Sequence, residues 1–275
     1  MAKSILITGC SSGIGYVCAH ALQKRGYHVI ASCRHPNDVH RLQQEGLTCI
    51  QLDLTDTQSI TTAVAQTLEL TNGKLDALFN NGAYGQPGAL EDLPTEALRT
   101  QFETNFFGWH ELVKQILPHM LEHNSGRIIQ NSSVLGFAAM KYRGAYNASK
   151  FALEGWTDTL RLELMDTGIQ ISLIEPGPIE TRFRANAKQA FIQWVDPSHG
   201  RHQKHYQQQL ERLDKESSNN AFVLPAESCI APVIHALESP TPKIRYRITK
   251  PTKVFAVLKR LLPTRWLDQI LRRAA

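Results

Sequence analysis

Short apolar runs rich in β-branched residues alternate with amphipathic stretches of helical spacing along most of the chain. The runs that we expect to form strands span residues 4–8, 28–32, 48–51, 77–80, 127–132, 170–175 and 244–248. Strands that alternate with helices indicate βαβ units and a parallel sheet with helices on both faces. We therefore predict one doubly wound α/β domain whose ligand crevice lies beyond the carboxyl ends of the strands.

Two regions interrupt this alternation. Residues from about 182 to 220 are rich in Gln, His, Lys and Ser and are too many for an ordinary connection, so we expect a mobile substrate-loop insertion. Residues 254–273 place apolar side chains at helical spacing, with Lys and Arg between them and Pro263 as an interruption. We predict a main domain over residues 1–250 and a basic amphipathic appendage of C-terminal helices over residues 251–275.

The positive charge of the chain is concentrated at one end. The net charge is +5, but residues 241–275 hold ten Lys or Arg and one acidic residue, which leaves a net charge of −4 for the rest. A nucleic-acid-binding domain typically carries a basic face across its fold. We therefore expect a small-molecule substrate and no nucleic-acid partner.

Composition also indicates the cellular compartment. Hydrophobic residues make up 42% of the chain, but no stretch approaches the roughly 20 consecutive apolar residues of a membrane span, and no signal peptide precedes the first strand-like run. The five cysteines are odd in number and include no Cys-x-x-Cys pair, which is typical of a reducing compartment. We expect a cytoplasmic protein.

The first expected strand leads directly into the segment TGCSSGIG, and a helical pattern follows. Glycines at positions 9, 13 and 15 permit a tight turn, let backbone N–H groups approach a pyrophosphate and place that anion at a helix N-terminus. The segment therefore predicts a dinucleotide site of the Rossmann type. An alternative is that Gly9-x-Ser11-x-Gly13 forms the nucleophile elbow of an α/β-hydrolase, with Ser11 as the nucleophile, although Gly15 has no role in an elbow.

The residues after the second expected strand bear on the choice of cofactor. Folds that select NAD place an acidic residue there to bind the ribose 2′-hydroxyl, whereas an arginine suits the 2′-phosphate of NADP. This chain has Ser32-Cys33-Arg34 at that position and no carboxylate. We predict that NADP(H) is preferred and that NAD is the less favoured cofactor.

Tyr146 and Lys150 are four residues apart, on one face of the helix expected to begin near residue 146. A nearby ammonium group stabilises phenolate and lowers the tyrosine pKa toward the range useful for proton transfer. Ser132 and Ser133 lie at the end of the preceding expected strand, where their hydroxyls could bind a substrate oxygen in the same crevice. The pattern predicts carbonyl reduction or alcohol oxidation.

Together these residues resemble the short-chain dehydrogenase/reductase family. The resemblance extends from about residue 3 to residue 181. It rests on TGCSSGIG, Asp53-Leu54, Asn80-Asn81-Gly82-Ala83, Asn105, Ser133, Tyr146-x-x-x-Lys150, and Pro176-Gly177 followed by Thr181.

The resemblance implies a role for each matching residue. Tyr146 would be the general acid/base, and Lys150 would lower its pKa and hold the nicotinamide ribose. Ser133 would orient the substrate carbonyl, and Asn105 would support a water that links Lys150 to solvent. Asp53 would contact the adenine and Thr181 the nicotinamide carboxamide. The predicted cofactor-binding set is Gly9, Ser11, Ser12, Gly13, Ile14, Gly15, Arg34, Asp53, Leu54, Asn81, Tyr146, Lys150, Pro176, Gly177, Ile179 and Thr181.

The chain departs from the family at one motif. The family usually has Asn-Asn-Ala-Gly where this chain has Asn80-Asn81-Gly82-Ala83. If the fourth position needs a positive φ, Ala83 is strained or the turn is reshaped. We expect a local adjustment near the adenine ribose with binding retained.

Several phrases resemble the hydroxysteroid and retinol dehydrogenase branch of the family, such as NFFG from Asn105, YNASKFALEG from Tyr146 and IEPGP from Ile174. This resemblance implies a lipophilic alcohol, aldehyde or ketone as substrate and a homo-oligomeric enzyme. We predict an NADP(H)-dependent oxidoreductase. The alternatives are the hydrolase that uses Ser11 and a non-catalytic dinucleotide-binding sensor.

Two further patterns suggest possible ligands or partners. His119-x-x-Glu122-His123 has the spacing of a zinc motif, but no third ligand is evident, and we predict no metal site. The apolar and basic residues of segment 254–273 are typical of a helix on an anionic membrane, and equally of a helix that docks on its own fold or on a sister subunit. The sequence leaves that choice open.

Overall fold

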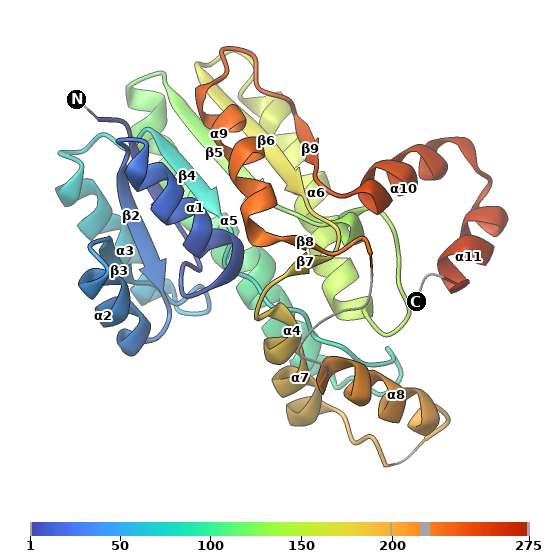
Figure 1. The fold of residues 1–275 in the computed structure, drawn as a ribbon. Helices are drawn as coiled ribbons and strands as arrows, with labels where there is room; N and C mark the ends of the chain where they lie inside the picture. The colour runs from blue at the N-terminus through green and yellow to red at the C-terminus, as the bar shows by residue number, and fades with distance from the viewer. Residues whose placement is uncertain (1, 199, 215–220, 274–275) are drawn as a thin grey trace.

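The computed structural model describes residues 2–198, 200–214 and 221–273. Seven parallel strands form the central sheet in the order β3-β2-β1-β4-β5-β6-β9 (Figure 1). Their bounds are β1 Ser4–Ile7, β2 His28–Cys33, β3 Thr48–Gln51, β4 Ala77–Asn80, β5 Gly126–Asn131, β6 Ile169–Glu175 and β9 Arg245–Arg247. The predicted doubly wound Rossmann sheet is confirmed, and its strand order reverses direction between β1 and β4, where such folds bind ligands.

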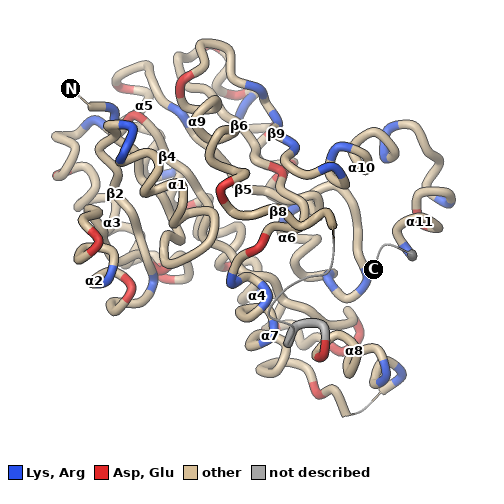
Figure 2. The backbone as a smooth tube through the Cα atoms, in the orientation of Figure 1, with Lys and Arg blue, Asp and Glu red and all other residues tan. Residues whose placement is uncertain are grey.

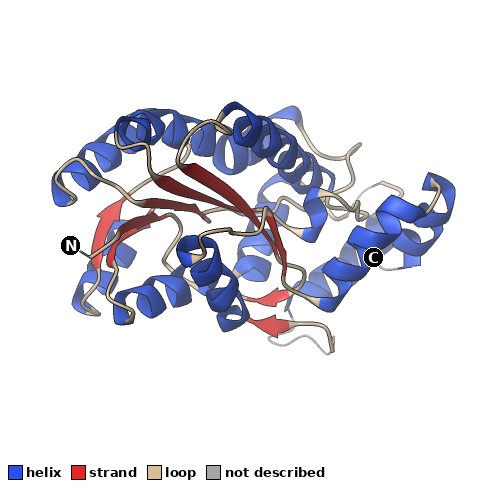
Figure 3. Ribbon diagram, turned by 90° about the horizontal axis from the view of Figure 1, so that it is seen from above, coloured by secondary structure: helices blue, strands red, loops and turns tan. Residues whose placement is uncertain are grey.

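Helices cover both faces of this sheet (Figure 3). Helices α3 Thr57–Leu70, α5 Gly108–Glu122 and α6 Gly144–Glu163 supply side chains to one core cluster. Helices α1 Gly13–Lys24, α2 Pro36–Gln44 and α9 Ile230–Glu238 supply the other. Because both faces are covered, strands such as β1 are buried at every position, which is why they read as unbroken apolar runs.

A π-helical turn, η1 Glu103–Phe107, joins α4 Thr95–Phe102 to α5 without an intervening loop. A short 3-10 turn, η2 Val134–Gly136, follows β5 and leads toward α6. Val134 and Leu135 of η2 line the cavity described below, whereas Asn105 of η1 contacts Tyr84, in the segment that follows β4.

The insertion expected from about residue 182 to 220 contains two helices and is flanked by two short strands. Helices α7 Phe183–Trp194 and α8 Gln203–Asp214 follow β7 Ile179–Glu180, which pairs with β8 Leu224–Pro225. Phe191 and Tyr206 are buried in a small cluster with Ala89, so the two helices pack on the segment that follows β4. Positions 199 and 215–220 of the expected insertion lie outside the described residues.

The C-terminal segment forms two helices, α10 Lys250–Leu261 and α11 Thr264–Arg273, which meet at Pro263 and project from the body of the molecule (Figure 1). Thr252 and Ala256 of α10 are buried against the body. Residues 274–275 of the expected appendage are not described. Within the described chain, no helix is both long and apolar enough to cross a membrane.

Candidate active site

A cavity of about 440 Å³ lies between α5 and α6, and a larger one of about 710 Å³ lies at the carboxyl ends of the strands. Most of the predicted site residues line the larger cavity. They are Gly9, Ser11, Ser12, Gly13, Ile14, Asn81, Ser133, Tyr146, Lys150, Pro176, Gly177, Ile179 and Thr181. The predicted residues that are not among its lining are Gly15, Arg34, Asp53, Leu54 and Asn105.

The glycines of the first loop leave no space for side chains. A Cβ at Gly15 would lie 2.5 Å from the carbonyl oxygen of Gly9, and one at Gly13 would lie 2.8 Å from Cγ2 of Thr181. Gly9 and Gly13 also have φ values of +69° and +62°, which residues with a Cβ rarely adopt. Ser12 makes no side-chain capping bond to α1. Backbone N–H groups at a helix start, with no Cβ in the way, fit a dinucleotide pyrophosphate.

Side-chain hydrogen bonds join this loop to the ends of β4 and β5. The Thr8 hydroxyl accepts from the backbone N–H of Asn81 and of Gly82, both at 2.8 Å. The Asn81 amide donates to the carbonyl oxygens of Thr8 and Gly9, at 2.9 and 3.1 Å, and its Oδ1 accepts from Asn131 at 2.9 Å. Asn81 therefore fixes the loop geometry as well as lining the cavity.

The strain expected at Ala83 does not occur. Among the described residues, the non-glycine positions with positive φ are Asn72, Asn124 and Tyr142. The residue of this motif that lies close to the glycine loop is Gly82, one position earlier, because a Cβ at Gly82 would be 3.2 Å from the Gly9 nitrogen. A glycine at the third position of the motif removes that contact, and alanine at the fourth position adopts an ordinary φ.

Two arginines lie near the adenosine end of the predicted cofactor site. Arg34 follows β2 and is exposed, and its guanidinium contacts the ring of His35. Arg41 of α2, which sequence analysis missed, donates to the Ser11 carbonyl oxygen at 2.7 Å and pairs with Asp38 and Glu45. Asp53 accepts from the N–H and hydroxyl of Thr55.

Tyr146 lies in the first turns of α6 and is almost fully buried. Its ring meets the ring of Phe183, at the start of α7, edge to face at 5.3 Å. Burial raises the Tyr146 pKa to about 12, and a hydrogen bond with the Ser133 hydroxyl opposes that shift. The raised pKa is opposite to the lowering expected from the Tyr146–Lys150 spacing, because desolvation dominates. The phenol is therefore protonated at neutral pH.

Lys150 lies one turn further along α6 and is also buried. Its Nζ donates to the Asn131 carbonyl oxygen at 2.7 Å and lies 4.3 Å from the ring centroid of Trp109. The Trp109 indole in turn donates to the Gly82 carbonyl oxygen at 2.9 Å. Burial lowers the Lys150 pKa to about 7, while Glu154 favours the charged form. Trp109, which no sequence pattern indicated, provides a cation–π contact for this ammonium group.

Asn105 lies in the π-helical turn η1 and is fully buried. Its amide nitrogen donates to the Tyr84 carbonyl oxygen at 2.9 Å and to the Ser149 hydroxyl at 3.3 Å, while its oxygen accepts from the Tyr84 N–H. Asn105 thus holds the segment after β4 against α6. Its bridging water to Lys150 stays a prediction.

An ion-pair cluster lies between α6 and the last strands. Arg245 bonds Glu154 at 3.1 Å and Glu175 at 3.0 Å, and Arg247 bonds the second oxygen of Glu175 at 3.1 Å. Burial raises the pKa of the fully buried Glu175 to about 7. Glu154 is one turn from Lys150 on α6 and favours its charged form, so the cluster connects the Lys150 ammonium group to the arginines of β9.

The other sequence patterns form no site in the described part of the chain. No group of three or more His, Cys, Asp or Glu side chains there could hold a metal ion. The His123 ring instead contacts the His119 carbonyl oxygen at the end of α5. All five cysteines are free and buried.

Comparison with known proteins places this geometry in a family. A family model described as short chain dehydrogenase matches residues 3–191. The uncharacterized oxidoreductase YbbO of Escherichia coli K12 is 43% identical over 99% of this chain and 95% of its own length. Human retinol dehydrogenase 8 is 40% identical over 66% of this chain and 60% of its own. The 3-ketodihydrosphingosine reductase of Bacteroides thetaiotaomicron is 31% identical over 98% and 96%.

Solved structures share the fold. A short-chain dehydrogenase from Streptomyces avermitilis is 27% identical and has a TM-score of 0.75, covering 100% of this chain and 99% of its own. A Burkholderia phymatum protein in complex with NAD has a TM-score of 0.79 at 24% identity, with coverage of 94% and 92%. A Burkholderia cenocepacia protein in complex with NADP has a TM-score of 0.76 at 20% identity, with coverage of 98% and 97%. The chain therefore belongs to the short-chain dehydrogenase family of oxidoreductases.

Proposed function

We propose that this oxidoreductase uses NADP(H) to interconvert a lipophilic aldehyde or ketone and the corresponding alcohol. The observation that carries the proposal is the wall of the larger cavity, where Tyr146 and Lys150 lie buried beside Ser133. The glycine loop lines the same cavity, so the proposed cofactor and substrate sites open into one continuous space.

The proposed chemistry divides between protein and cofactor. The bound nicotinamide supplies hydride in the reductive direction and accepts it in the oxidative direction. In reduction, Tyr146 donates its phenol proton to the carbonyl oxygen, which Ser133 orients, as the new C–H bond forms. The Lys150 ammonium stabilises the phenolate left behind. In oxidation the same phenolate removes the proton of the alcohol.

The preference for NADP(H) is supported by charge at the end of β2. Arg34 is exposed there and no carboxylate occupies positions 32–34, whereas Arg41 of α2 is bound to Ser11 and already pairs with Asp38 and Glu45. An arginine at this position can pair with a 2′-phosphate, whereas NAD-selecting folds place an acid. Arg34→Ala should weaken NADPH binding at least 10-fold, because hydrogen bonds to a charged group contribute about 1.5–3 kcal/mol, and should leave NADH binding nearly unchanged. Fluorescence titration with both nucleotides tests this, with the exposed Arg99→Ala as control. Equal losses for both nucleotides would remove Arg34 from the argument.

A lipophilic substrate is supported by the apolar lining and by relatives. Val134, Leu135, Phe183, Phe222 and Phe255 line the larger cavity. Two relatives are named for acting on retinol and on 3-ketodihydrosphingosine. We therefore expect retinoid, steroid or long-chain aldehydes and ketones to react with higher kcat/KM than short water-soluble ones.

The test is a panel of aldehydes, retinoids and steroids assayed with NADPH and NADH by absorbance. Tyr146→Phe should lower kcat by at least 100-fold, since general acid catalysis contributes about 10²–10⁴-fold, with NADPH binding retained. Tyr27→Phe, which removes a phenol remote from the cavity lining, is the matched control. If the protein keeps its cellular role when Tyr146→Phe has removed the catalytic phenol, the alternative of a non-catalytic dinucleotide-binding sensor is favoured. The hydrolase alternative gains no support from the relatives, which are oxidoreductases.

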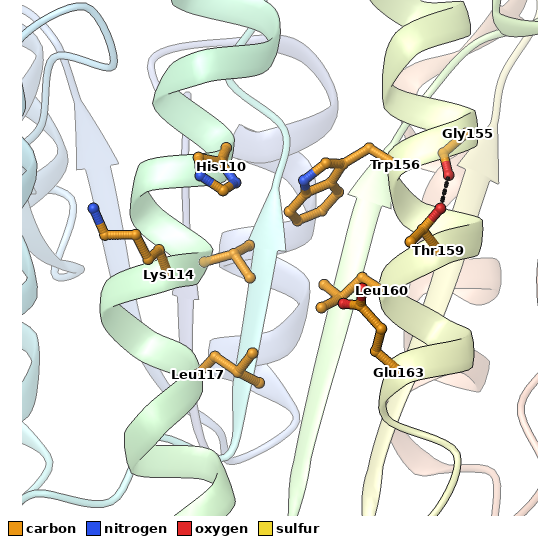
Figure 4. A pocket seen from close by; sticks show the side chains of 9 residues that line it. His110, Lys114, Leu117, Gly155, Trp156, Thr159, Leu160 and Glu163 are labelled. Carbon is orange, nitrogen blue, oxygen red and sulfur yellow. Dashed lines mark hydrogen bonds between the residues drawn. The ribbon is translucent and has the colours of Figure 1, made fainter.

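We also propose that the chain forms homo-oligomers through the groove between α5 and α6 (Figure 4). The cavity of about 440 Å³ there is lined by apolar side chains such as Leu117 and Trp156. Lys114 of α5, which pairs with Glu111 at 2.8 Å, and Glu163 of α6 also line the groove, so a twofold contact can place opposite charges near each other. Leu117→Glu should dissociate the oligomer in light scattering, and the exposed Leu121→Glu should not. A monomeric wild type would refute this part.

A further inference from the structure

The two C-terminal helices expose apolar side chains along one stripe each. On α10 these are Val254, Val257 and Leu261, which are 53%, 53% and 74% exposed. On α11 they are Trp266 and Ile270, which are 61% and 38% exposed. Spacings of three, four and seven residues place side chains on the same side of a helix. Each helix therefore has an apolar strip that the described part of the chain leaves exposed.

Basic side chains flank these strips. Among the residues of this segment whose side chains are described, the charged ones are Lys250, Lys253, Lys259, Arg260, Arg265 and Arg272, with Asp268 as the one acid. Figure 2 shows the basic positions along α10 and α11, at the end of the molecule remote from β2 and α2. Apolar strips flanked by Lys and Arg are the pattern of helices that lie in an anionic lipid interface.

The body of the protein holds α10 in place. The Lys259 ammonium donates to the Phe137 carbonyl oxygen at 2.6 Å and lies 4.6 Å from the ring centroid of Phe151. The Thr249 hydroxyl caps the helix by accepting from the N–H of Thr252, whose side chain is buried. Docking on the protein's own fold thus accounts for one side of α10 and leaves the apolar strip outward.

The same two helices border the candidate active site. Phe255 of α10 and Leu271 of α11 line the larger cavity together with Tyr146. A molecule that approaches along this part of the wall passes side chains of the C-terminal helices before it reaches the phenol. The two helices that expose the apolar strips therefore also contribute to the wall of the proposed substrate space.

We propose that α10 and α11 bind an anionic lipid surface and hold the adjoining part of the cavity at that surface, so that a membrane-dissolved alcohol or carbonyl compound enters without crossing water. The second half of this inference rests on the proposed function, whereas the lipid binding does not. A second copy of the chain is a poorer occupant, because pairing two such surfaces brings two sets of like charges together.

Flotation of the full-length protein with vesicles tests the binding without any catalytic readout. The protein should float with vesicles that contain phosphatidylglycerol in phosphatidylcholine and should float far less with phosphatidylcholine alone. Arg265→Gln/Arg272→Gln should weaken binding about 30-fold, because each cation near an anionic surface contributes about 5-fold. The control Lys24→Gln/Arg99→Gln removes two exposed cations elsewhere and should bind as the wild type does.

A second pair of variants tests the apolar strip. Trp266→Ser/Ile270→Ser should abolish flotation, whereas the control Leu162→Ser/Met165→Ser, which removes exposed apolar side chains of the α6 end, should not. Equal flotation of all variants, or no flotation of the wild type, overturns the inference. Light scattering that shows a dimer lost only with Trp266→Ser/Ile270→Ser also overturns it, because a second copy is then the occupant.

Substrate delivery has its own readout. Anionic vesicles should raise kcat/KM for a long-chain aldehyde and leave kcat/KM for a short water-soluble aldehyde unchanged. Flotation without this activation refutes delivery from the membrane while the lipid binding stands. If the wild-type protein floats with anionic vesicles but reduces neither aldehyde, with or without vesicles, the proposed function is contradicted and the lipid binding is not.

Discussion

The contact between Trp109 and Lys150 leads to a quantitative prediction about pH. In the variant Trp109→Leu, the buried ammonium group loses an aromatic face 4.3 Å from its nitrogen. A desolvated cation–π contact contributes about 2 kcal/mol, which corresponds to about 1.5 pKa units. The Lys150 pKa, which burial already lowers to about 7, should therefore fall further.

The measurement is the pH profile of kcat/KM in the reductive direction. In the proposed reaction the Lys150 ammonium stabilises the phenolate as it forms, so we expect the reductive rate to be lost as the pH rises through the Lys150 pKa. In Trp109→Leu this alkaline limb should move to lower pH by about one to 1.5 units. The spectrophotometric rate of NADPH oxidation gives the profile directly.

Trp109→Phe is the matched control. It keeps an aromatic face under the ammonium and loses the indole N–H that binds the Gly82 carbonyl oxygen. Its unfolding free energy should fall by about 1 kcal/mol or more, because a buried acceptor loses its donor, while its alkaline limb should move less than half as far as that of the leucine variant. Identical limbs for the wild type and both variants would falsify the cation–π argument, provided that circular dichroism shows both variants folded.

The remaining predictions concern stability. Gly13→Ala, which puts a Cβ 2.8 Å from Thr181 at a φ of +62°, should lower the unfolding free energy by at least 1–2 kcal/mol and weaken NADPH binding, as urea unfolding and fluorescence titration would show. Arg245→Met removes one cation from the buried Glu175 and should cost about 3 kcal/mol near pH 8, with a smaller loss below pH about 7, where that carboxyl is protonated. The folded pKa of Lys150 is about 7, below the unfolded value near 10.4. Between these pH values the unfolded chain binds more protons than the folded protein. The unfolding free energy of the wild type should therefore rise relative to that of Lys150→Met by about 1.4 kcal/mol per pH unit. Parallel plots of unfolding free energy against pH for the two proteins would show that this amine is not buried in the folded protein.

The strands were predictable because they are buried on both faces. The run at 77–80 is the observed β4, and the run at 127–132 differs from β5 by one residue at each end. Parallel strands under helices are apolar throughout, so their positions follow from composition alone. The insertion was harder to interpret, because α7 and α8 are polar and owe their order to a few anchors such as Phe191 and Tyr206.

The site was predictable where its residues are neighbours in sequence. The glycine loop and the Tyr146–Lys150 spacing could be identified because one turn or one helix face holds each group together. Trp109, Arg41 and Phe255 were missed because elements far apart in the chain bring them to the site. The predicted lowering of the Tyr146 pKa was wrong, because the sequence pattern indicates the nearby cation but not the burial of the phenol, which raises the pKa.

The π-helical turn at Glu103–Phe107 determines which way the side chains of the following helix, α5, point. A turn of this kind carries one residue more than an α-helical turn, and each residue of a helix advances it by about 100°. Removing a single residue there would leave an unbroken α-helix, yet it would swing the indole of Trp109 roughly a quarter of a circle away from the amine it now faces. We expect the length of this segment to tolerate less change than the identity of its outward side chains.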